Sequence, residues 1–296
     1  MAVASGKAVE VPVSGVVTEE SGAARADASC DEALFERDGS RIVPTGLARG
    51  PWRPDTLHGA AVAAVLACGI DVPGWTPVRV TFDLLAPIRS VPMTLSVTEA
   101  EGGKRVVRQT VTLLEGDTPV ARAQCLAVRK AELELPEGVT AHPDPFAGVP
   151  VPDLTRPKPN VSEAVGWESF DGGAVSLRSL KSPDLDGNSI GMWVRLLVPV
   201  IAGEPTPSLA RAAVAADYAS AATNTRLSFE RWSFMNAELS LHVSREPVGS
   251  WVGLVSAGVV QPNGCGLSVG TLYDSDGRLG QSAQALVVEA RSRGPA

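Results

Sequence analysis

One acidic residue stands inside a helix that otherwise consists of small apolar residues. Asp217 follows the run Ala212–Ala216, and the sequence Tyr-Ala-Ser comes directly after it. Burying a carboxylate costs several kcal/mol unless it is hydrogen-bonded or takes part in chemistry. A carboxylate beside a water molecule can orient it or accept its proton, as a general base does. We therefore interpret Asp217 as a candidate catalytic residue; the alternative is an Asp on the exposed face of its helix.

A second candidate lies at the start of another helix of small residues, where His58, Gly59 and Ala60 follow one another. A helix N-terminus offers unpaired N–H groups and a positive dipole end, which can polarise a carbonyl oxygen or stabilise an oxyanion. Gly59 has no side chain, so a reacting carbon could approach closely. The alternative for His58 is a helix cap or a solvated side chain.

Both helices belong to a duplicated unit, because four pairs of segments match in the same order and at nearly constant spacing. The pairs are Gly50–Trp52 with Gly191–Trp193, Leu57–Val65 with Leu209–Asp217, Arg79–Leu85 with Glu238–Ser244, and Ala123–Arg129 with Ala283–Val288. Val65 stands where the second copy has Asp217, and the second copy in turn lacks His58-Gly59. These complementary losses indicate one composite site in a pseudo-dimer.

Each copy reads as one helix followed by antiparallel strands with Gly-, Asp- and Asn-containing turns between them. This pattern is typical of an α+β unit whose helix lies on one face of its sheet. We expect helices near 57–68 and 209–221, and strands at 78–85, 93–99, 105–114, 120–128, 237–243, 251–260, 267–273 and 283–289. The expected domains are 32–133 and 161–296, with a Pro-rich linker at 134–160 between them and an unassigned extension at 1–31.

The motifs of both copies resemble those of bacterial acyl-CoA thioesterase II and its actinobacterial relatives. RGPWRPDTLHGAAVAAVLA, TPVRVTFDLLAPI and VARAQCLAVRK resemble the first half of that family, and GMWVRL, AAVAADYAS, FMNAELSLHVSREPVGSWV and LYDSDGRLGQSAQALVVEAR resemble the second half. The likeness covers roughly residues 35 to 291 apart from the linker. It implies a double hotdog, in which two helix-plus-sheet units form a pseudo-dimer with one continuous antiparallel sheet around two central helices.

The resemblance also implies a water molecule held by an Asp, a Thr or Ser, and a Gln of the second half. Those places fall on Asp217, Asn236 and Gln284. Asn236 departs from the family, because an amide can hydrogen-bond a water but cannot donate as a hydroxyl does. Structural alternatives exist for two of them. Asn236 also suits a turn before a strand, and Gln284 has a repeat partner in Gln124, as a structural strand hydrogen bond would.

Thioester hydrolysis is the leading hypothesis, with an acyl-CoA or an acyl-carrier-protein thioester as the substrate. No metal, cofactor or covalent intermediate is expected. Asp217 would activate or orient the water, and Asn236 and Gln284 would hold it. The amides of Gly59 and Ala60 would receive the charge that develops on the carbonyl oxygen.

Two other classes of function stay open. Hotdog folds also host hydratases and dehydratases of acyl thioesters, and fold alone does not separate these from thioesterases. A His58 side chain facing Asp217 is the feature that would favour such a lyase. The third hypothesis is a non-hydrolytic acyl-thioester-binding accessory protein for lipid or polyketide biosynthesis, because Asn236 replaces the family's hydroxyl.

Composition and charge exclude several partners. The net charge of −7 argues against nucleic acid and anionic membranes, which require clustered Lys and Arg. No run of about 18 apolar residues is present, and the first residues lack the pattern of a signal peptide, so we expect a cytoplasmic protein. Self-association into a homo-oligomer is left open by the sequence.

Three other features of the sequence are interpreted as structural rather than catalytic. The segment Gly266–Gly270 matches GxSxG, but a strand and a turn follow it rather than a helix, so we reject a nucleophile elbow. The four cysteines show no metal-ligand spacing, and Cys68 and Cys125 are expected to be buried thiols. Trp52, Trp193 and Trp251 are expected to anchor the core.

Overall fold

A computed structural model of the protein describes residues 32–139, 144, 146, 166–180, 185, 189–224, 227 and 231–291. The expected extension at 1–31 and most of the linker at 134–160 lie outside the described residues. The domain boundaries therefore stay predictions. Within the described ranges, none of the helices is long and apolar enough to cross a membrane.

Each half consists of one main helix and a set of antiparallel strands. The first half contains β1 (Phe35–Asp38), β2 (Arg41–Pro44), η1 (Gly46–Ala48), α1 (Gly59–Cys68), β3 (Trp75–Leu84), β4 (Met93–Val97), β5 (Glu101–Gly102), β6 (Val106–Glu115) and β7 (Thr118–Arg129). The second contains η2 (Phe170–Ala174), β8 (Val175–Leu180), β9 (Ser189–Leu196), α3 (Ser208–Asp217), η3 (Tyr218–Ser220), α4 (Ala221–Asn224), β10 (Trp232–Val243), β11 (Val252–Val260), β12 (Cys265–Asp274) and β13 (Gly277–Ala290). All the expected helices and strands are present, with shifted ends.

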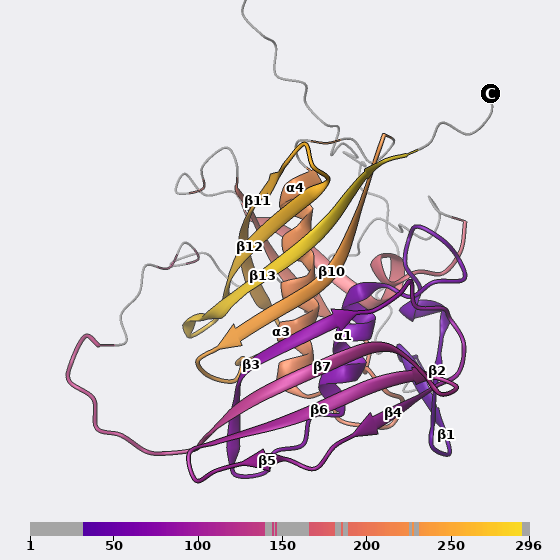
Figure 1. Ribbon diagram of the computed structural model, residues 1–296. Coiled ribbons are helices and arrows are strands. Elements are labelled where there is room, and N and C mark those ends of the chain that lie inside the picture. Colours follow the sequence, from indigo (N-terminus) through magenta and orange to yellow (C-terminus); the bar gives the residue numbers. More distant parts are fainter. Residues whose placement is uncertain are drawn as a thin grey trace, which may run out of the picture.

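The strands form one continuous sheet whose order is symmetric about its centre. The order runs β1-β2-β4-β6-β7-β3-β10-β13-β12-β11-β9-β8, with β5 paired to β6, so β3 and β10 form the seam between the halves (Figure 1). Thr81 pairs with Ser240 at this seam, and their hydroxyl oxygens lie 3.3 Å apart at a sequence separation of 159 residues. The same separation of 159 residues also relates corresponding positions on the strands next to the seam, β7 and β13. The predicted continuous sheet of a double hotdog is confirmed.

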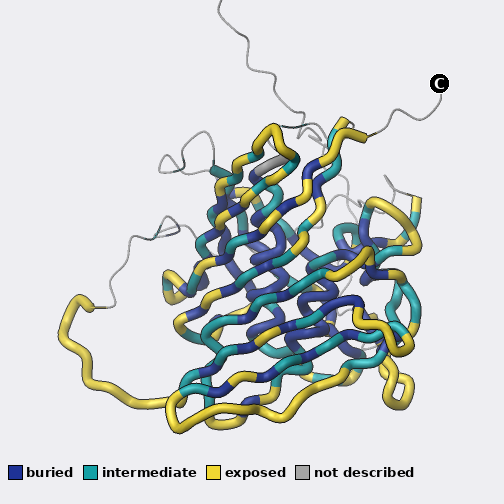
Figure 2. Tube along the Cα trace, viewed as in Figure 1, coloured by how far each residue is buried: buried dark blue, intermediate teal, exposed yellow. Residues whose placement is uncertain are grey.

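The two long helices lie side by side against one face of this sheet (Figure 1). Every residue of α1 from Ala60 to Ala67 is buried, and so is most of α3, which places both helices in the core (Figure 2). Their alanines leave room for close helix packing and for contact with the strands. The facing ends of the two helices therefore lie inside the protein.

Two expectations about tryptophans and their segments are wrong. Trp193 and Trp251 are buried, but 45% of Trp52 is exposed, so Trp52 does not anchor the core. The match of Gly50–Trp52 with Gly191–Trp193 also fails, because the first segment lies in a turn region and the second forms part of β9. Strand β9 corresponds by its place in the sheet to β2, which ends at Pro44. A three-residue motif is too short to define a strand register.

Candidate active site

Asp217 is the last residue of α3 and is almost fully buried, with 6% exposure. Its Oδ1 accepts a hydrogen bond of 2.9 Å from Nδ2 of Asn236 on β10. The alternative of an Asp on the outer helix face is therefore excluded. Asn236 is followed by an irregularity in the pairing of β10 with β13, a feature that often redirects side chains beside functional sites.

The N-terminus of α1 faces this carboxylate from the other half of the chain. A Cβ on Gly59 would stand 2.9 Å from Oδ1 of Asp217, a distance that real Cβ contacts do not reach without a shift. The site is thus composite: the first half supplies a helix N-terminus and the second half supplies the acid. Only a residue without a side chain allows the helix to come this close.

His58 caps α1 and also approaches two carboxylates. Its Nδ1 accepts a 3.0 Å hydrogen bond from the backbone N–H of Ala60, which fits the helix-cap alternative. The same Nδ1 lies 3.5 Å from Oδ2 of Asp217, and Nε2 lies 3.5 Å from Oδ2 of Asp171. Because the Ala60 amide already has an acceptor, the Gly59 amide is the better placed of the two for a ligand oxygen. The imidazole is stacked on the Phe170 ring at a centroid distance of 4.8 Å.

Asp171 is a site residue that the sequence reasoning missed. It lies in the short helical turn η2, and its Oδ1 accepts a 2.5 Å hydrogen bond from the hydroxyl of Tyr218. Tyr218 directly follows Asp217 on the chain, so one hydrogen bond ties η2 to the end of α3. The motif Phe-Asp-Gly-Gly-Ala has neither helical nor strand periodicity, and the only available signal was an acid between a Phe and two glycines.

Gln284 is completely buried on β13 and supports the end of α3. Its Nε2 donates to the backbone carbonyls of Ala216 and Asp217 at 3.1 and 3.0 Å. Its Oε1 is buried and has no hydrogen-bond partner within the described part of the chain. Leaving such an acceptor unpaired costs about 1–3 kcal/mol, so a donor is favoured at this place.

The repeat partner proposed for Gln284 is wrong. Gln284 pairs with Leu239, and the counterpart of Leu239 at the 159-residue separation is Val80, which pairs with Cys125. Gln124 lies on the opposite face of the sheet, where its amide donates to Asp83. A difference of one residue in register turns a side chain to the other face. The buried glutamine is therefore particular to the second half, where its structural role consists of the two hydrogen bonds to carbonyls of α3.

The same comparison identifies the counterparts of the other two residues. Pro77 corresponds to Asn236, because an equivalent irregularity follows each of them. The sequence match sets Val65 against Asp217, but the helix bounds set Cys68 there, because Cys68 and Asp217 are the last residues of α1 and α3. The pseudo-symmetric positions thus carry Cys68, Pro77 and Cys125, which include no acid and no amide side chain. Burial raises the pKa of the Cys125 thiol to about 11.

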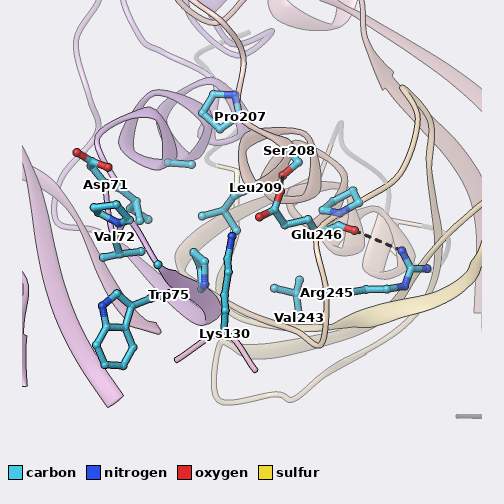
Figure 3. A pocket seen from close by; sticks show the side chains of 16 residues that line it. Asp71, Val72, Trp75, Lys130, Pro207, Ser208, Leu209, Val243, Arg245 and Glu246 are labelled. Atoms are coloured by element: carbon cyan, nitrogen blue, oxygen red, sulfur yellow. Dashed lines mark hydrogen bonds between the residues drawn. The ribbon is translucent and has the colours of Figure 1, made fainter. Parts of the chain in front are cut away.

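A surface pocket of about 290 Å³ lies near this apolar counterpart, not at the candidate site (Figure 3). It is lined by Trp75 and Pro77 of β3, by the loop after α1 with Asp71, and by the start of α3 with Ser208 and Leu209. Asp217, Asn236, Gln284 and His58 do not line it. This pocket therefore does not coincide with the candidate site, which is defined by buried polar residues.

Burial is the largest influence on the titration of the Asp217 carboxyl and raises its pKa above the ordinary value. The neighbouring His58 and the hydrogen bond from Asn236 lower the pKa in part, and the charge of Asp171 raises it. Burial and the contact with Asp171 also raise the pKa of the Tyr218 hydroxyl, which stays protonated. A carboxyl with a raised pKa is a stronger base once it is ionised, which suits proton transfer.

Two further expectations can be compared with the structure. Ser268 of the GxSxG match lies within β12 and is fully buried, and its hydroxyl donates to the carbonyl of Ala219. A strand interior is not a nucleophile elbow, so the rejection of that motif is confirmed. Across the ranges that the structure describes, no group of three or more His, Cys, Asp or Glu side chains is arranged to hold a metal ion.

Comparisons with known proteins agree with this architecture. Residues 48–128 match the family model of the acyl-CoA thioesterase N-terminal domain, and residues 136–288 match that of the acyl-CoA thioesterase C-terminal domain. No curated protein matches the chain in sequence at a significant level.

Three solved structures illustrate the shared fold. A thioesterase II candidate of Thermobifida fusca YX is 19% identical, with a TM-score of 0.65 over 88% of this chain and 97% of that one. A conserved protein with a hot dog fold from Alicyclobacillus acidocaldarius is 15% identical, with a TM-score of 0.61 over 91% and 100%. The acyl-CoA thioesterase II TesB2 of Mycobacterium marinum is 14% identical, with a TM-score of 0.55 over 87% and 96%. At these identities the likeness supports the fold alone.

Proposed function

This chain belongs to the acyl-CoA thioesterase family, and from that premise we propose that it hydrolyses an acyl-CoA thioester with a water held by Asp217, Asn236 and Gln284. The observation that carries the proposal is the buried Asp217 carboxylate facing the N-terminus of α1 across the two halves. A buried acid beside the N-terminus of a helix offers a base and, at the Gly59 amide, an oxyanion site close to each other.

In the proposed reaction, ionised Asp217 accepts a proton from the water as its oxygen attacks the thioester carbonyl carbon. The charge that develops on the carbonyl oxygen is stabilised by the Gly59 amide at the helix N-terminus. Collapse of the tetrahedral intermediate breaks the C–S bond, and the proton from Asp217 passes to the leaving thiolate. The products are a carboxylic acid and free CoA.

Asn236 can serve this water although it replaces the family's hydroxyl. One hydrogen of its Nδ2 is donated to Asp217, so its carbonyl oxygen can accept a hydrogen bond from water and the second Nδ2 hydrogen can donate one. The unpaired Oε1 of Gln284 supplies a second acceptor at the end of α3. A water molecule has two protons, so the Asp217 carboxylate and one of these two amide oxygens would accept them and leave a lone pair for attack.

We further propose one active site per chain. The pseudo-symmetric positions carry Cys68, Pro77 and Cys125, which offer neither a carboxylate nor an amide side chain for water. The opposite helix start also lacks a glycine, because α3 begins with Ser208 where α1 begins with Gly59.

One observation favours the hydratase or dehydratase alternative: Nδ1 of His58 lies 3.5 Å from Oδ2 of Asp217. Such enzymes need a histidine nitrogen that is free to exchange a proton with the substrate. Here Nδ1 accepts the Ala60 amide and Nε2 lies beside Asp171, so both nitrogens have structural contacts. We therefore rank the lyase second and a non-hydrolytic binding role third.

The test is release of free thiol, measured with DTNB, from a series of saturated acyl-CoA thioesters of increasing chain length. The wild-type protein should release thiol. Asp217→Asn keeps the shape but removes the charge, and it should lose kcat by about a hundredfold or more. Asp71→Asn is the matched control, because Asp71 is an exposed acid at the other pocket (Figure 3).

Substrate specificity and carrier can be read from the same assay. Parallel reactions with acyl-carrier-protein thioesters would decide which carrier is used. A wild type that releases no thiol but adds water to an enoyl-CoA would establish the lyase alternative. A wild type that only binds acyl-CoA would establish the binding role.

A further inference from the structure

The segment before α1 carries an exposed tryptophan beside the candidate active site. Trp52 is 45% exposed, and the centroids of its ring and of the His58 imidazole lie 5.3 Å apart, with the two planes inclined by 33°. His58 is buried, and its Nδ1 lies 3.5 Å from Oδ2 of Asp217. A single imidazole ring therefore separates an indole that reaches solvent from the buried carboxylate.

The start of α1 is accessible to solvent. Gly59 is half-buried, whereas every residue from Ala60 to Ala67 is buried. Because Trp52 contacts His58, the residue directly before Gly59, the indole lies beside this opening. A thioester whose carbonyl oxygen reaches the Gly59 amide therefore passes close to Trp52.

The backbone holds the indole in this place. Gly50 donates its N–H to the carbonyl of Thr56 at 2.9 Å, and its own carbonyl accepts a 3.1 Å hydrogen bond from Nε1 of Trp167. A Cβ on Gly50 would stand 2.6 Å from Cε3 of Trp52, so the ring lies directly against this glycine. A ring that is fixed before a ligand arrives loses little conformational freedom on binding, and this favours recognition.

The second half shows that the fold does not require an aromatic residue in this segment. The connection between β2 and α1 contains Trp52, and the corresponding connection between β9 and α3 covers residues 197–207. That segment, LVPVIAGEPTP, has no aromatic residue. The indole is therefore specific to the half whose helix start faces Asp217, which indicates a role in binding rather than in folding.

Charge and exposure indicate which part of a substrate the indole contacts. The neighbouring Arg53 and Asp55 form a bidentate ion pair with distances of 2.9 and 2.8 Å, so the turn between Gly50 and Thr56 offers no uncompensated charge to a phosphate. The nucleotide of CoA is multiply charged and stays in water, whereas an acyl chain gains free energy by leaving water. Between them lies the pantetheine arm, an uncharged chain with methyl groups that can pack on an aromatic ring and amides that can point at its face.

We propose that Trp52 is a substrate-contact residue on which the pantetheine arm of the thioester packs as it leads from the active site to solvent. This inference rests on the proposed function, because it takes Asp217 and Gly59 as the place of the thioester. The pantetheine arm is common to CoA and to acyl carrier proteins. Trp52 therefore serves either carrier in the same way and does not select the acyl chain.

The experiment is equilibrium binding of thioether analogues that cannot be hydrolysed, measured by isothermal titration calorimetry. S-ethyl-, S-octyl- and S-dodecyl-CoA vary the chain, and S-octyl-pantetheine omits the nucleotide. Trp52→Ala should raise the dissociation constant by about tenfold or more, and by the same factor for every analogue that the wild type binds. Trp52→Phe keeps an aromatic ring and should stay within about threefold of the wild type.

Two further variants sharpen the measurement. Gly50→Ala retains Trp52, but its Cβ must displace the indole, so it should weaken binding as Trp52→Ala does. Val97→Ala is the control, because Val97 on β4 is also 45% exposed and should bind the analogues as the wild type does. Thermal unfolding verifies that each variant is folded.

Several results would overturn the proposal. An effect of Trp52→Ala that grows with chain length would place the acyl chain on the indole, and an effect that disappears with S-octyl-pantetheine would place the nucleotide there. A wild type that binds none of the analogues would also overturn it. Because the analogues are not hydrolysed, unchanged binding in Trp52→Ala overturns this inference alone, whereas a wild type that binds them but releases no thiol from acyl-CoA overturns the proposed function alone.

Discussion

Gly59 and Asp217 begin and end two helices from different halves of the chain, and a Cβ on Gly59 would stand 2.9 Å from Oδ1 of Asp217. Neither residue has this neighbour within its own half. The closeness places an acid beside a helix N-terminus, which neither hotdog unit could do alone. The pseudo-dimer is therefore a condition for the candidate site.

This contact predicts the effect of a single methyl group. Gly59→Ala should displace the Asp217 carboxylate and lower kcat by about tenfold to a hundredfold, the scale for a reacting group misplaced by an ångström. The melting temperature should not fall in proportion, because Ala is a better helix former than Gly. Gly103→Ala is the matched control, since a Cβ there meets nothing within 4 Å. Equal kcat values for the two variants would contradict the argument.

The buried charge of Asp217 also predicts a trade-off with stability. The folded protein raises the pKa of this carboxyl, so it binds the proton more tightly than the unfolded chain does. The free energy of unfolding should then fall as pH rises from the ordinary Asp pKa to the raised one. Asp217→Asn should be more stable than wild type at neutral pH and equally stable in acid below that window. Thermal unfolding across pH measures this, and a variant less stable at neutral pH would refute it.

Asp171 should tune the pH dependence of the reaction. Its negative charge raises the pKa of Asp217, so Asp171→Asn should lower that pKa and move the acid limb of the kcat profile to lower pH. Activity in this limb requires ionised Asp217 and therefore rises with pH. Tyr218→Phe is the control, because it removes the hydrogen bond to Asp171 but keeps the charge. An acid limb that does not move in Asp171→Asn would remove this residue from the electrostatics of the site.

Position 236 should accept a side chain with a hydroxyl group but not a purely hydrocarbon one. Asn236→Thr can still hydrogen-bond Asp217 or a water, so it should keep kcat within about tenfold of wild type or raise it. Asn236→Leu has a similar size but leaves Asp217 without its 2.9 Å donor, and it should lose about a hundredfold. The DTNB assay at saturating substrate compares the two. If both variants kept the wild-type rate, Asn236 would have no part in holding the water.

Much of the architecture could be predicted from local patterns. The alanine runs define α1 and α3, and the alternating β-branched strands define the sheet, because periodicity and propensity act over a few residues. The repeated order of helix and strands predicts one continuous antiparallel sheet, and the structure places its seam between β3 and β10. An acid among alanines singled out Asp217, which the structure buries. The catalytic and binding roles of the site residues stay predictions.

Other features depend on tertiary structure. Gln124 looks like the partner of Gln284, but strand register places them on opposite faces, and the partner is Cys125. A shift of one residue in strand register turns a side chain to the other face of the sheet. A sequence match does not determine the register where the strand pairing is irregular.

By itself, the sequence determined the duplicated α+β architecture and singled out Asp217. The first follows from local residue patterns, and the second from the free-energy cost of burying a charge. Only the tertiary structure decided what surrounds that residue. Asp171 arrives on a short turn 46 residues before Asp217 in the chain, and Tyr218, 47 residues from it, holds it by a hydrogen bond. Contacts between distant segments arise from packing of whole elements, so no local pattern of residues encodes them.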